Sequence, residues 1–157
     1  MITIEEKIKA LGIILPPAPK PAGSYVPLVQ INDLVYLSGQ IPIDTNAEYP
    51  FVKYKGKIGQ DTTIENGQQA ALLCTLNSIS LIKNHLKSLD RIKKVVKVSA
   101  YINCVSTFSE HPKVINPASE LIVNIFGDKG NHTRIALGVG SLPLESVVEI
   151  EYLFQVN

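Results

Sequence analysis

The stretch TRIALGVGSLPLESVVEIE, residues 133–151, decides the fold, because it reads as two β-strands separated by a proline turn. In the first strand, apolar side chains alternate with Arg134 and with small residues, which is the period of a strand with two different faces. The second strand, Val147 to Gln155, carries Glu149 and Glu151 on one face and apolar side chains on the other. The stretch therefore predicts two strands of a sheet that present an arginine and two carboxylates.

Arg134 is the candidate ligand-binding residue of the first strand. Its neighbours on the same face, Ala136 and Gly138, are small, so a hollow beside the guanidinium is expected. The planar fork of donors on a guanidinium suits a carboxylate. The same pattern also fits an exposed ion pair on a half-solvated sheet, in which Glu149 is simply an ion-pair partner, and this is the commoner arrangement on pattern alone.

Length and composition predict one domain, residues 1–157, that associates with copies of itself. The chain is 45% hydrophobic and 18% charged, below the roughly 25% charged residues of a typical soluble domain. A small protein with so few charges would expose apolar surface as a monomer. The formal net charge is +1 and the basic residues are scattered, which argues against a nucleic-acid partner on electrostatic grounds.

Cysteine and histidine spacing predicts neither a metal site nor a disulfide framework. Cys74 and Cys104 are far apart, and the three histidines are dispersed, so reduced thiols in a cytoplasmic protein are expected. The apolar segment at residues 11–15 is too short to span a membrane. Glu5 and Glu6 stand where a signal peptide would carry positive charge, so we expect a soluble protein without a membrane partner.

The first 23 residues form a predicted extension. Residues 1–15 predict a short amphipathic helix, with a capping box of Thr3 and Glu6 and an end at Gly12. The sequence PPAPKPAG, residues 16–23, predicts an extended, stiff strap across the surface.

The central elements alternate between strands and helices. Two strands, 26–31 and 34–38, are expected around a tight turn at Asn32-Asp33, and residues 43–60 read as a long loop with room for one short strand. A capping box of Thr62 and Glu65 predicts the start of the longest helix, which ends near Lys87.

A third strand and a third helix complete the pattern. The β-branched run at residues 92–103 predicts a long strand. Asn116 before Pro117 predicts an N-cap followed by proline at the first helical position, and Gly127 ends this helix. The order of elements predicts an α+β fold, with a sheet covered on one face by two helices. The other sheet face has no predicted cover, which again favours self-association.

Seven motifs follow one another along the chain from about Pro16 to the C-terminus. They are PAGSY at 21–25, YLSGQIP at 36–42, ENGQQAALLCTLN at 65–77, VVKVSAYIN at 95–103, FSEHPKVIN at 108–116, HTRIALGVGSLP at 132–143 and VVEIE at 147–151. With these motifs in this order, the sequence resembles the Rid family (YjgF/YER057c/UK114, reactive-intermediate deaminases), in particular a longer subgroup with an N-terminal extension.

The resemblance implies a chorismate-mutase-like α+β fold, assembled as a homotrimer with the sheets facing inward and clefts between subunits. It also implies a hydrolase that needs no cofactor and no metal. The expected reaction converts reactive enamine or imine intermediates, of the 2-aminoacrylate or 2-imino acid type, to 2-oxo acids and ammonia. The ligand is then a small imino or 2-oxo acid.

The resemblance also assigns roles to residues. Arg134 matches the carboxylate-binding arginine, and Glu149 matches the acidic residue near the attacking water. The other positions expected to line the cleft are Tyr25, Ser38, Gly39 and Asn116, with backbone groups of Ile135 and Ala136 available to the nitrogen or the water.

Other interpretations of these residues remain open. Tyr25 also fits an anchor for the strap, Ser38-Gly39 fits a simple bulge, and His132 fits a loop histidine as well as a cleft residue. Many family members have a cysteine where this chain has Ala136, so no thiol role is expected there. The N-terminal helix and the loop at 43–60 add bulk near the cleft, so the archetypal small substrate is not assumed.

Two further functions compete with the deaminase. A non-catalytic protein that binds small carboxylates would use the same arginine. An endoribonuclease or translation inhibitor, an activity attributed to some relatives, fits poorly with the near-neutral charge and with the absence of a stacking platform in the sequence.

Overall fold

A mixed five-stranded sheet carries the fold in the computed structural model, which describes residues 2–157. The strands are β1 (Leu28–Ile31), β2 (Leu34–Leu37), β5 (Ile92–Asn103), β6 (Thr133–Val139) and β7 (Val148–Val156). Their order across the sheet is β1-β2-β7-β5-β6, and only β5 and β6 run parallel. β7 therefore lies inside the sheet, whereas β6 is an edge strand.

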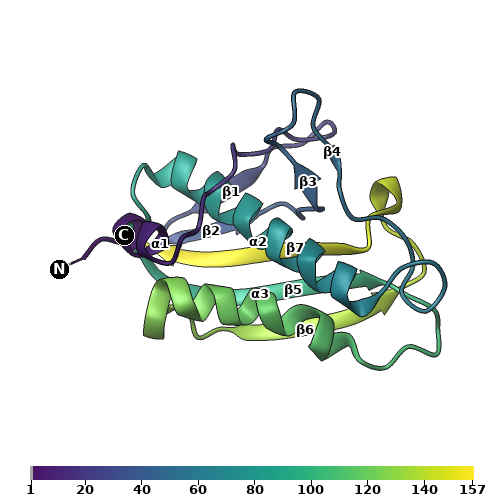
Figure 1. Cartoon of the computed structure of the whole chain (residues 1–157). Helices are drawn as coiled ribbons and strands as arrows, with labels where there is room; N and C mark the ends of the chain where they lie inside the picture. Colours follow the sequence, from purple (N-terminus) through teal and green to yellow (C-terminus); the bar gives the residue numbers. More distant parts are fainter. Residues whose placement is uncertain (1) are drawn as a thin grey trace.

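Two helices, α2 (Ile64–Leu86) and α3 (His111–Phe126), pack against each other and cover one face of the sheet (Figure 1). Between the layers lies the core, in which Val98, Ile102, Ile150 and Phe154 are fully buried. This arrangement confirms the predicted α+β class. The shorter helix α1 (Ile4–Ala10) contacts α3 near the N-terminus.

Several local predictions are confirmed. The Thr3–Glu6 capping box of α1 is present, and Gly12 follows the helix with a φ of 70°. Asn32 turns the β1–β2 hairpin with a positive φ of 54°, a conformation that asparagine tolerates better than most residues. β5 begins and ends at the predicted residues.

Two predictions around residues 43–66 are corrected. Residues 43–60 contain two short strands, β3 (Ile43–Asp44) and β4 (Phe51–Val52), which pair with each other as a second sheet. The N-cap of α2 is Thr63, whose hydroxyl oxygen accepts from the Asn66 N–H at 3.2 Å. The Thr62 hydroxyl instead accepts from the Asn66 side-chain amide at 3.3 Å, so the predicted Thr62–Glu65 box is wrong.

The start of α3 is also corrected, because the helix begins at His111 and not after Asn116. Pro112 occupies the first turn, where a missing N–H costs nothing. Pro117 lies inside the helix and cannot donate to the Lys113 carbonyl four residues before it. That carbonyl accepts from the side-chain amide of Gln68 in α2 at 2.9 Å, so the hydrogen bond lost to proline is replaced from the neighbouring helix.

Residues 2–157 also contain three single-turn helices: η1 (Leu89–Arg91), η2 (Gly127–Gly130) and η3 (Pro143–Glu145). The sheet face opposite α2 and α3 exposes large apolar side chains. Val29, Ile31, Tyr36, Ile135 and Leu137 are each at least 42% exposed. Residues 2–157 include no helix that combines the length and the apolarity of a membrane span.

Candidate functional site

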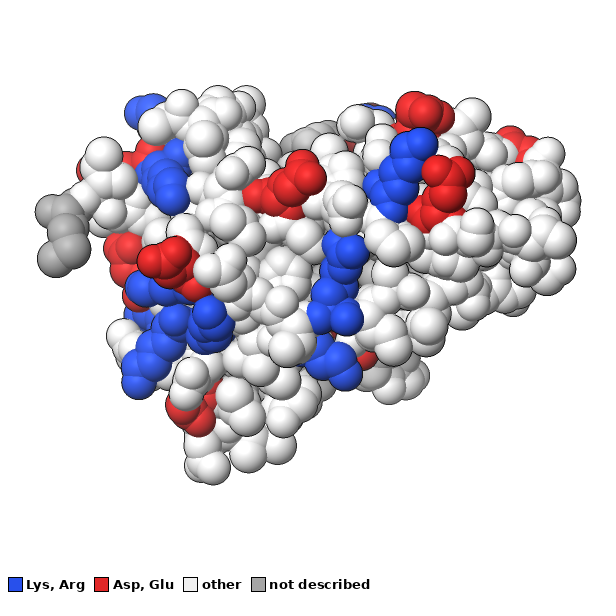
Figure 2. Space-filling model, turned by 90° about the horizontal axis from the view of Figure 1, so that it is seen from below, with Lys and Arg blue, Asp and Glu red and all other residues white. Residues whose placement is uncertain are grey.

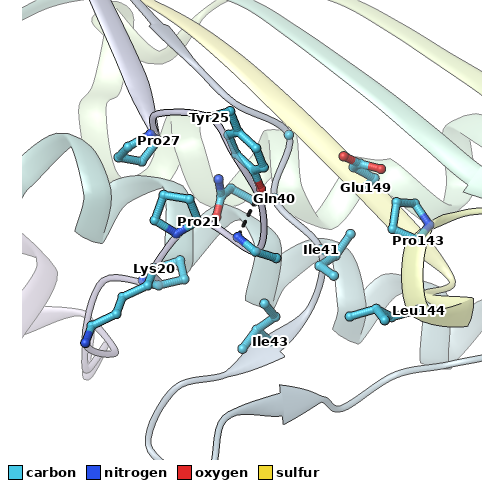
Figure 3. A pocket seen from close by; sticks show the side chains of 13 residues that line it. Lys20, Pro21, Tyr25, Pro27, Gln40, Ile41, Ile43, Pro143, Leu144 and Glu149 are labelled. Atoms are coloured by element: carbon cyan, nitrogen blue, oxygen red, sulfur yellow. Dashed lines mark hydrogen bonds between the residues drawn. The ribbon is translucent and has the colours of Figure 1, made fainter.

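A cavity of about 270 Å³ lies where the strap, the segment after β2 and the start of β7 meet (Figure 3). It brings together three of the predicted site residues, Tyr25, Gly39 and Glu149. Ser38 does not line it. Its hydroxyl donates to the Val26 carbonyl at 2.7 Å, which joins the residue after β2 to the segment between the strap and β1.

Glu149 is the acidic group of this cavity. It lies on β7 beside Tyr101 of β5, and Glu151 is the next residue on the same face of β7. Partial burial and, second, the Glu151 carboxylate raise the pKa of Glu149 above its usual value. A carboxylate with a raised pKa is a stronger base, which is the property that proton abstraction from water requires.

The absence of a side chain at Gly39 leaves space for the Glu149 carboxylate. A Cβ at position 39 would overlap the Glu149 Oε1 atom, so only glycine fits against the carboxylate. The neighbouring Gln40 fixes this approach, because it exchanges two backbone hydrogen bonds with Ile150 of β7, at 2.8 and 3.0 Å. The glycine interpreted as a bulge in the sequence thus permits close backbone approach to the acidic group.

Tyr25 both anchors the strap and lines the cavity. Its hydroxyl oxygen accepts from the Ala22 N–H at 3.4 Å, and its side chain is 50% exposed (Figure 3). The two interpretations of Tyr25 are therefore compatible in one position.

Arg134 forms a second polar cluster, on the helix-covered side of β6. Its Nη1 donates to the Asn116 side-chain oxygen at 3.0 Å and to the Ser119 hydroxyl at 3.1 Å, both in α3. Ser119 also lies 3.0 Å from Nε2 of His132, whose Nδ1 is 2.6 Å from the Gly130 carbonyl. A carbonyl only accepts, so in neutral His132 the proton is on Nδ1 and Ser119 donates to Nε2.

This cluster leaves the guanidinium able to bind an anion. Within residues 2–157, the hydrogen bonds of Arg134 use only Nη1, and no carboxylate lies within ion-pair distance. Nη2 and Nε therefore have no protein partner in this part of the chain. Neutral oxygens from Asn116 and Ser119 hold the side chain in place without neutralising its charge.

Arg134 and Glu149 lie on opposite faces of the sheet within one chain. Arg134 pairs with Val98 and Glu149 pairs with Tyr101. Since Val98 and Tyr101 are three residues apart on β5, their side chains point to opposite faces. An ion pair between Arg134 and Glu149 is therefore excluded within one chain.

The pairing of β6 with β5 also places the two remaining predicted site residues, Ile135 and Ala136. Ala136 shares the helix-covered face with Arg134, while Ile135 points to the open face and is 42% exposed. Because β6 is an edge strand, its outer backbone groups are available for pairing beyond the sheet.

Sequence reasoning missed Ser119 and Leu144. Ser119 stands three residues after Asn116, a spacing that places both on one helix face, but this signal depends on the helix beginning before Asn116. Leu144 lines the cavity, and no feature of the sequence marks it apart from its place beside Pro143.

No three His, Cys, Asp or Glu side chains converge as a potential metal site within residues 2–157. Both cysteines are unpaired and buried, and burial raises the pKa of each thiol. The Sγ atom of Cys104 lies 3.6 Å from Nε2 of His111.

Comparison with known proteins finds similarity along nearly the whole chain. The sequence profile of the "YjgF/chorismate mutase-like, putative endoribonuclease" family matches residues 5–156. Protein TCP17 of Trypanosoma cruzi is 36% identical over 155 residues, covering 98% of this chain and 94% of TCP17.

Two crystal structures have the same fold. The protein Atu1372, of unknown function, from Agrobacterium tumefaciens has a TM-score of 0.87 and 35% identity, covering 98% of this chain and 92% of that one. A "putative endoribonuclease" from Shewanella oneidensis MR-1 has a TM-score of 0.90 and 30% identity, covering 98% and 99%.

Proposed function

Since this chain belongs to the YjgF/chorismate mutase-like family, we propose that it is a cofactor-free hydrolase of reactive enamines and imines. The proposed substrates are of the 2-aminoacrylate or 2-imino acid type, and the products are a 2-oxo acid and ammonia. Family membership itself confirms the resemblance to the Rid family that the motifs indicated.

The observation that carries the proposal is the Glu149 carboxylate, with its raised pKa, at the side of a mostly apolar cavity. Hydrolysis of a protonated imine needs little more than a positioned water and a group that accepts its proton, because the imine carbon is already electrophilic. A general base typically accelerates such a step by about 100- to 10,000-fold.

The proposed reaction has two steps. Glu149 takes a proton from water as the water oxygen bonds to C2 and the C=N electron pair moves to nitrogen. Glu149 then returns the proton to nitrogen and accepts the proton of the carbinolamine hydroxyl as the C–N bond breaks. The C–O bond becomes the carbonyl of the 2-oxo acid, ammonia leaves, and the proton on Glu149 passes to ammonia or to solvent. An enamine enters the same path after it gains a proton at C3.

Arg134 supplies the proposed carboxylate anchor, but only from a second copy of the chain. The guanidinium and Glu149 lie on opposite faces of one sheet, whereas β6 is at the sheet edge and can reach a neighbour. The cavity's own cation, Lys20, extends away from Glu149 (Figure 3). Two charge-assisted hydrogen bonds from Arg134 would orient the substrate carboxylate.

We infer the homotrimer from the same features. A ring of three copies, with the open sheet faces inward, would cover Val29, Ile31, Tyr36, Ile135 and Leu137, which one copy leaves exposed. Such a ring repeats one heterologous contact three times and closes. Each contact then builds one site from two chains.

The surface charge supports a small-molecule ligand over RNA. Figure 2 shows the surface seen from below relative to Figure 1. On this face, basic side chains form separate groups, with acidic groups near several of them and uncharged surface between them. Binding to a phosphate backbone relies on many basic contacts along a track.

The test is competition for an imine formed in solution. An amino-acid oxidase with catalase, or a serine dehydratase, produces the imine or enamine, and semicarbazide traps what is not hydrolysed. We expect this protein to lower the yield of semicarbazone, and Arg134→Ala and Glu149→Gln each to abolish the effect. Lys129→Ala, which removes an exposed cation on η2, is the control.

The proposal fails if the wild-type protein accelerates no imine or if Arg134→Ala is as active as wild type. Saturable binding of 2-oxo acids without turnover would identify a carboxylate-binding protein instead.

A further inference from the structure

A series of hydrogen bonds behind Arg134 ends on a main-chain carbonyl. Nη1 of Arg134 donates to the Ser119 hydroxyl at 3.1 Å, this hydroxyl lies 3.0 Å from Nε2 of His132, and Nδ1 of His132 lies 2.6 Å from the Gly130 carbonyl oxygen. A guanidinium can only donate and a carbonyl can only accept. With His132 neutral, each hydrogen of the series therefore has one position, and all of them point from Arg134 toward Gly130.

The Gly130 end of this series is rigid. Gly130 is buried in η2, and a Cβ at this position would meet the Ile122 carbonyl oxygen at 2.6 Å and Cα of Val123 at 2.9 Å, both in α3. The backbone of residue 130 thus packs directly against the helix that carries Ser119. Its carbonyl fixes which ring nitrogen of His132 carries the proton, and thereby makes Nε2 an acceptor.

Ser119 differs from two hydroxyl residues of α2 in the partner of its hydroxyl. Thr75 and Ser78 each donate to the carbonyl four residues earlier in their own helix, at 2.7 and 2.8 Å, a common partner for a hydroxyl inside a helix. Within residues 2–157, the hydrogen bonds of the Ser119 side chain go to Arg134 and His132 instead. Because a hydroxyl has one hydrogen, donation to His132 leaves the oxygen lone pairs facing Arg134.

His132 is therefore the group that keeps the Ser119 oxygen available to Arg134. Without an acceptor at Nε2, the Ser119 hydroxyl is free to donate to the Ile115 carbonyl, four residues earlier in α3. The other acceptor of Nη1 is the side chain of Asn116, which is exposed, so water competes for that hydrogen bond. Ser119 is half-buried and meets less competition, and its orientation depends on His132.

We propose that His132 is a positioning residue for ligand binding: through Ser119, it holds the Arg134 guanidinium in the orientation that binds the substrate carboxylate. Because the groups that hold Arg134 are neutral, the charge of the guanidinium stays available to the ligand. The inference rests on the proposed function for the identity of the ligand, whereas the hydrogen-bond series can be tested in the free protein.

Two substitutions separate the two ring nitrogens of His132. His132→Asn keeps an amide donor near the Nδ1 position for Gly130 but removes the acceptor, whereas His132→Gln places an amide oxygen near the Nε2 position for Ser119. In calorimetry, we expect His132→Asn to weaken pyruvate binding about tenfold, the effect of one hydrogen bond to a charged group. His132→Gln should bind pyruvate within about threefold of wild type.

The semicarbazide competition assay gives the kinetic counterpart. Arg134 is proposed to hold the carboxylate equally in the ground state and in the transition state. For the imine formed from alanine by an amino-acid oxidase, kcat/KM should therefore fall in His132→Asn by the same factor of about ten, with kcat unchanged.

A double-mutant cycle shows whether His132 acts through Ser119. Ser119→Ala should itself weaken pyruvate binding about tenfold, and His132→Asn should have no further effect in that background. A residue that only stabilised the fold would lower Tm and add its cost in both backgrounds.

Nitrogen NMR measures the hydrogen-bond series without a ligand. At a pH where His132 is neutral, we expect the proton on Nδ1 and none on Nε2. The guanidinium signals of Arg134 should broaden in His132→Asn and stay as in wild type in His132→Gln. If the wild-type protein neither hydrolyses imines nor binds pyruvate, the proposed function fails, and these spectra still decide whether His132 positions Arg134.

His85→Asn is the matched control. Nε2 of His85, in α2, lies 2.6 Å from the side-chain oxygen of Gln30 in β1, so the same substitution removes one histidine contact away from Arg134. It should match wild type in binding, kinetics and the Arg134 spectrum.

Four results would each overturn the positioning role of His132. They are wild-type affinity in His132→Asn, an equal loss in His132→Gln, a further loss in the Ser119→Ala background, and a proton on Nε2 in the free protein. A fall in kcat/KM larger than the loss of pyruvate affinity would also overturn it, because His132 would then act on the chemical step.

Discussion

Gly39 lies so close to the Glu149 carboxylate that any side chain at position 39 would displace it. Its backbone is not in the left-handed region, so alanine is permitted by conformation and excluded only by contact. Gly39→Ala should therefore fold normally but move the base away from the water. We expect kcat/KM to fall roughly 100-fold, the cost typical of a displacement of about 1 Å in a catalytic group.

Gly140→Ala is the control for this change, because a Cβ at Gly140 meets no atom within 4 Å. It should retain wild-type kinetics. Full activity in Gly39→Ala would show that the position of the Glu149 carboxylate does not matter to the reaction.

The charge of Glu151 acts on Glu149 along the same strand face. Burial raises the pKa of Glu149 first, and the Glu151 carboxylate raises it further. Glu151→Gln removes that repulsion, so the pKa of Glu149 should fall. Because the base works as the ionised form, the acidic limb of the kcat/KM profile should move to lower pH, most clearly at low ionic strength, where charges are least screened.

Glu65→Gln, in the first turn of α2, should leave the pH profile in place. Light scattering on Glu151→Gln would check that its assembly is unchanged. If the acidic limb of the kcat/KM profile stays in place or moves to higher pH in Glu151→Gln, the assignment of Glu149 as the titrating base is contradicted.

At the scale of elements, a hydrogen bond between α2 and α3 replaces the helical hydrogen bond that Pro117 removes. Gln68 donates to the Lys113 carbonyl that proline leaves without its helical donor. Gln68→Ala should destabilise the protein by about 1 kcal/mol, which lowers Tm by about 2–4 °C in a chain of this size.

A double-mutant cycle tests this compensation. In a Pro117→Ala background the helix regains its own N–H donor, so Gln68→Ala should cost less than it does in the wild type. Equal costs in the two backgrounds would show that Gln68 acts elsewhere.

The limits of a helix or strand could be predicted from the sequence where neighbouring residues determine them. The β-branched run gave β5 its limits, and the Thr3–Glu6 box gave α1 its start. The start of α3 was missed because proline after asparagine resembles a first turn, and the group that makes an interior Pro117 acceptable, Gln68, lies far away in the sequence. Such compensation between elements has no local signature.

The candidate site likewise combines features that local motifs predict with features that depend on contacts between distant segments. The residues matched by motif, Tyr25, Gly39 and Glu149, do meet in one cavity. That Arg134 and Glu149 face opposite sides of the sheet depends on the register of both strands with β5. Alternation within each strand predicts two faces, but it does not say which face of one strand continues into which face of another.

At the scale of the whole molecule, one chain holds the two halves of the proposed site apart. The guanidinium is held by hydrogen bonds to Asn116 and Ser119, and the carboxylate lies against Gly39, which leaves it space. The exposed apolar sheet face and the free edge at β6 are the surfaces through which copies can join. We therefore expect activity to be a property of the assembly.

Mixing two inactive variants tests this claim most directly. Arg134→Ala keeps the carboxylate half and Glu149→Gln keeps the guanidinium half, so a contact between one copy of each can contain an intact site. After equal amounts are unfolded and refolded together, about a quarter of the contacts in random trimers should be intact, and imine hydrolysis should return to about a quarter of the wild-type rate. No recovery in trimers shown by light scattering to be mixed would contradict a site shared between subunits.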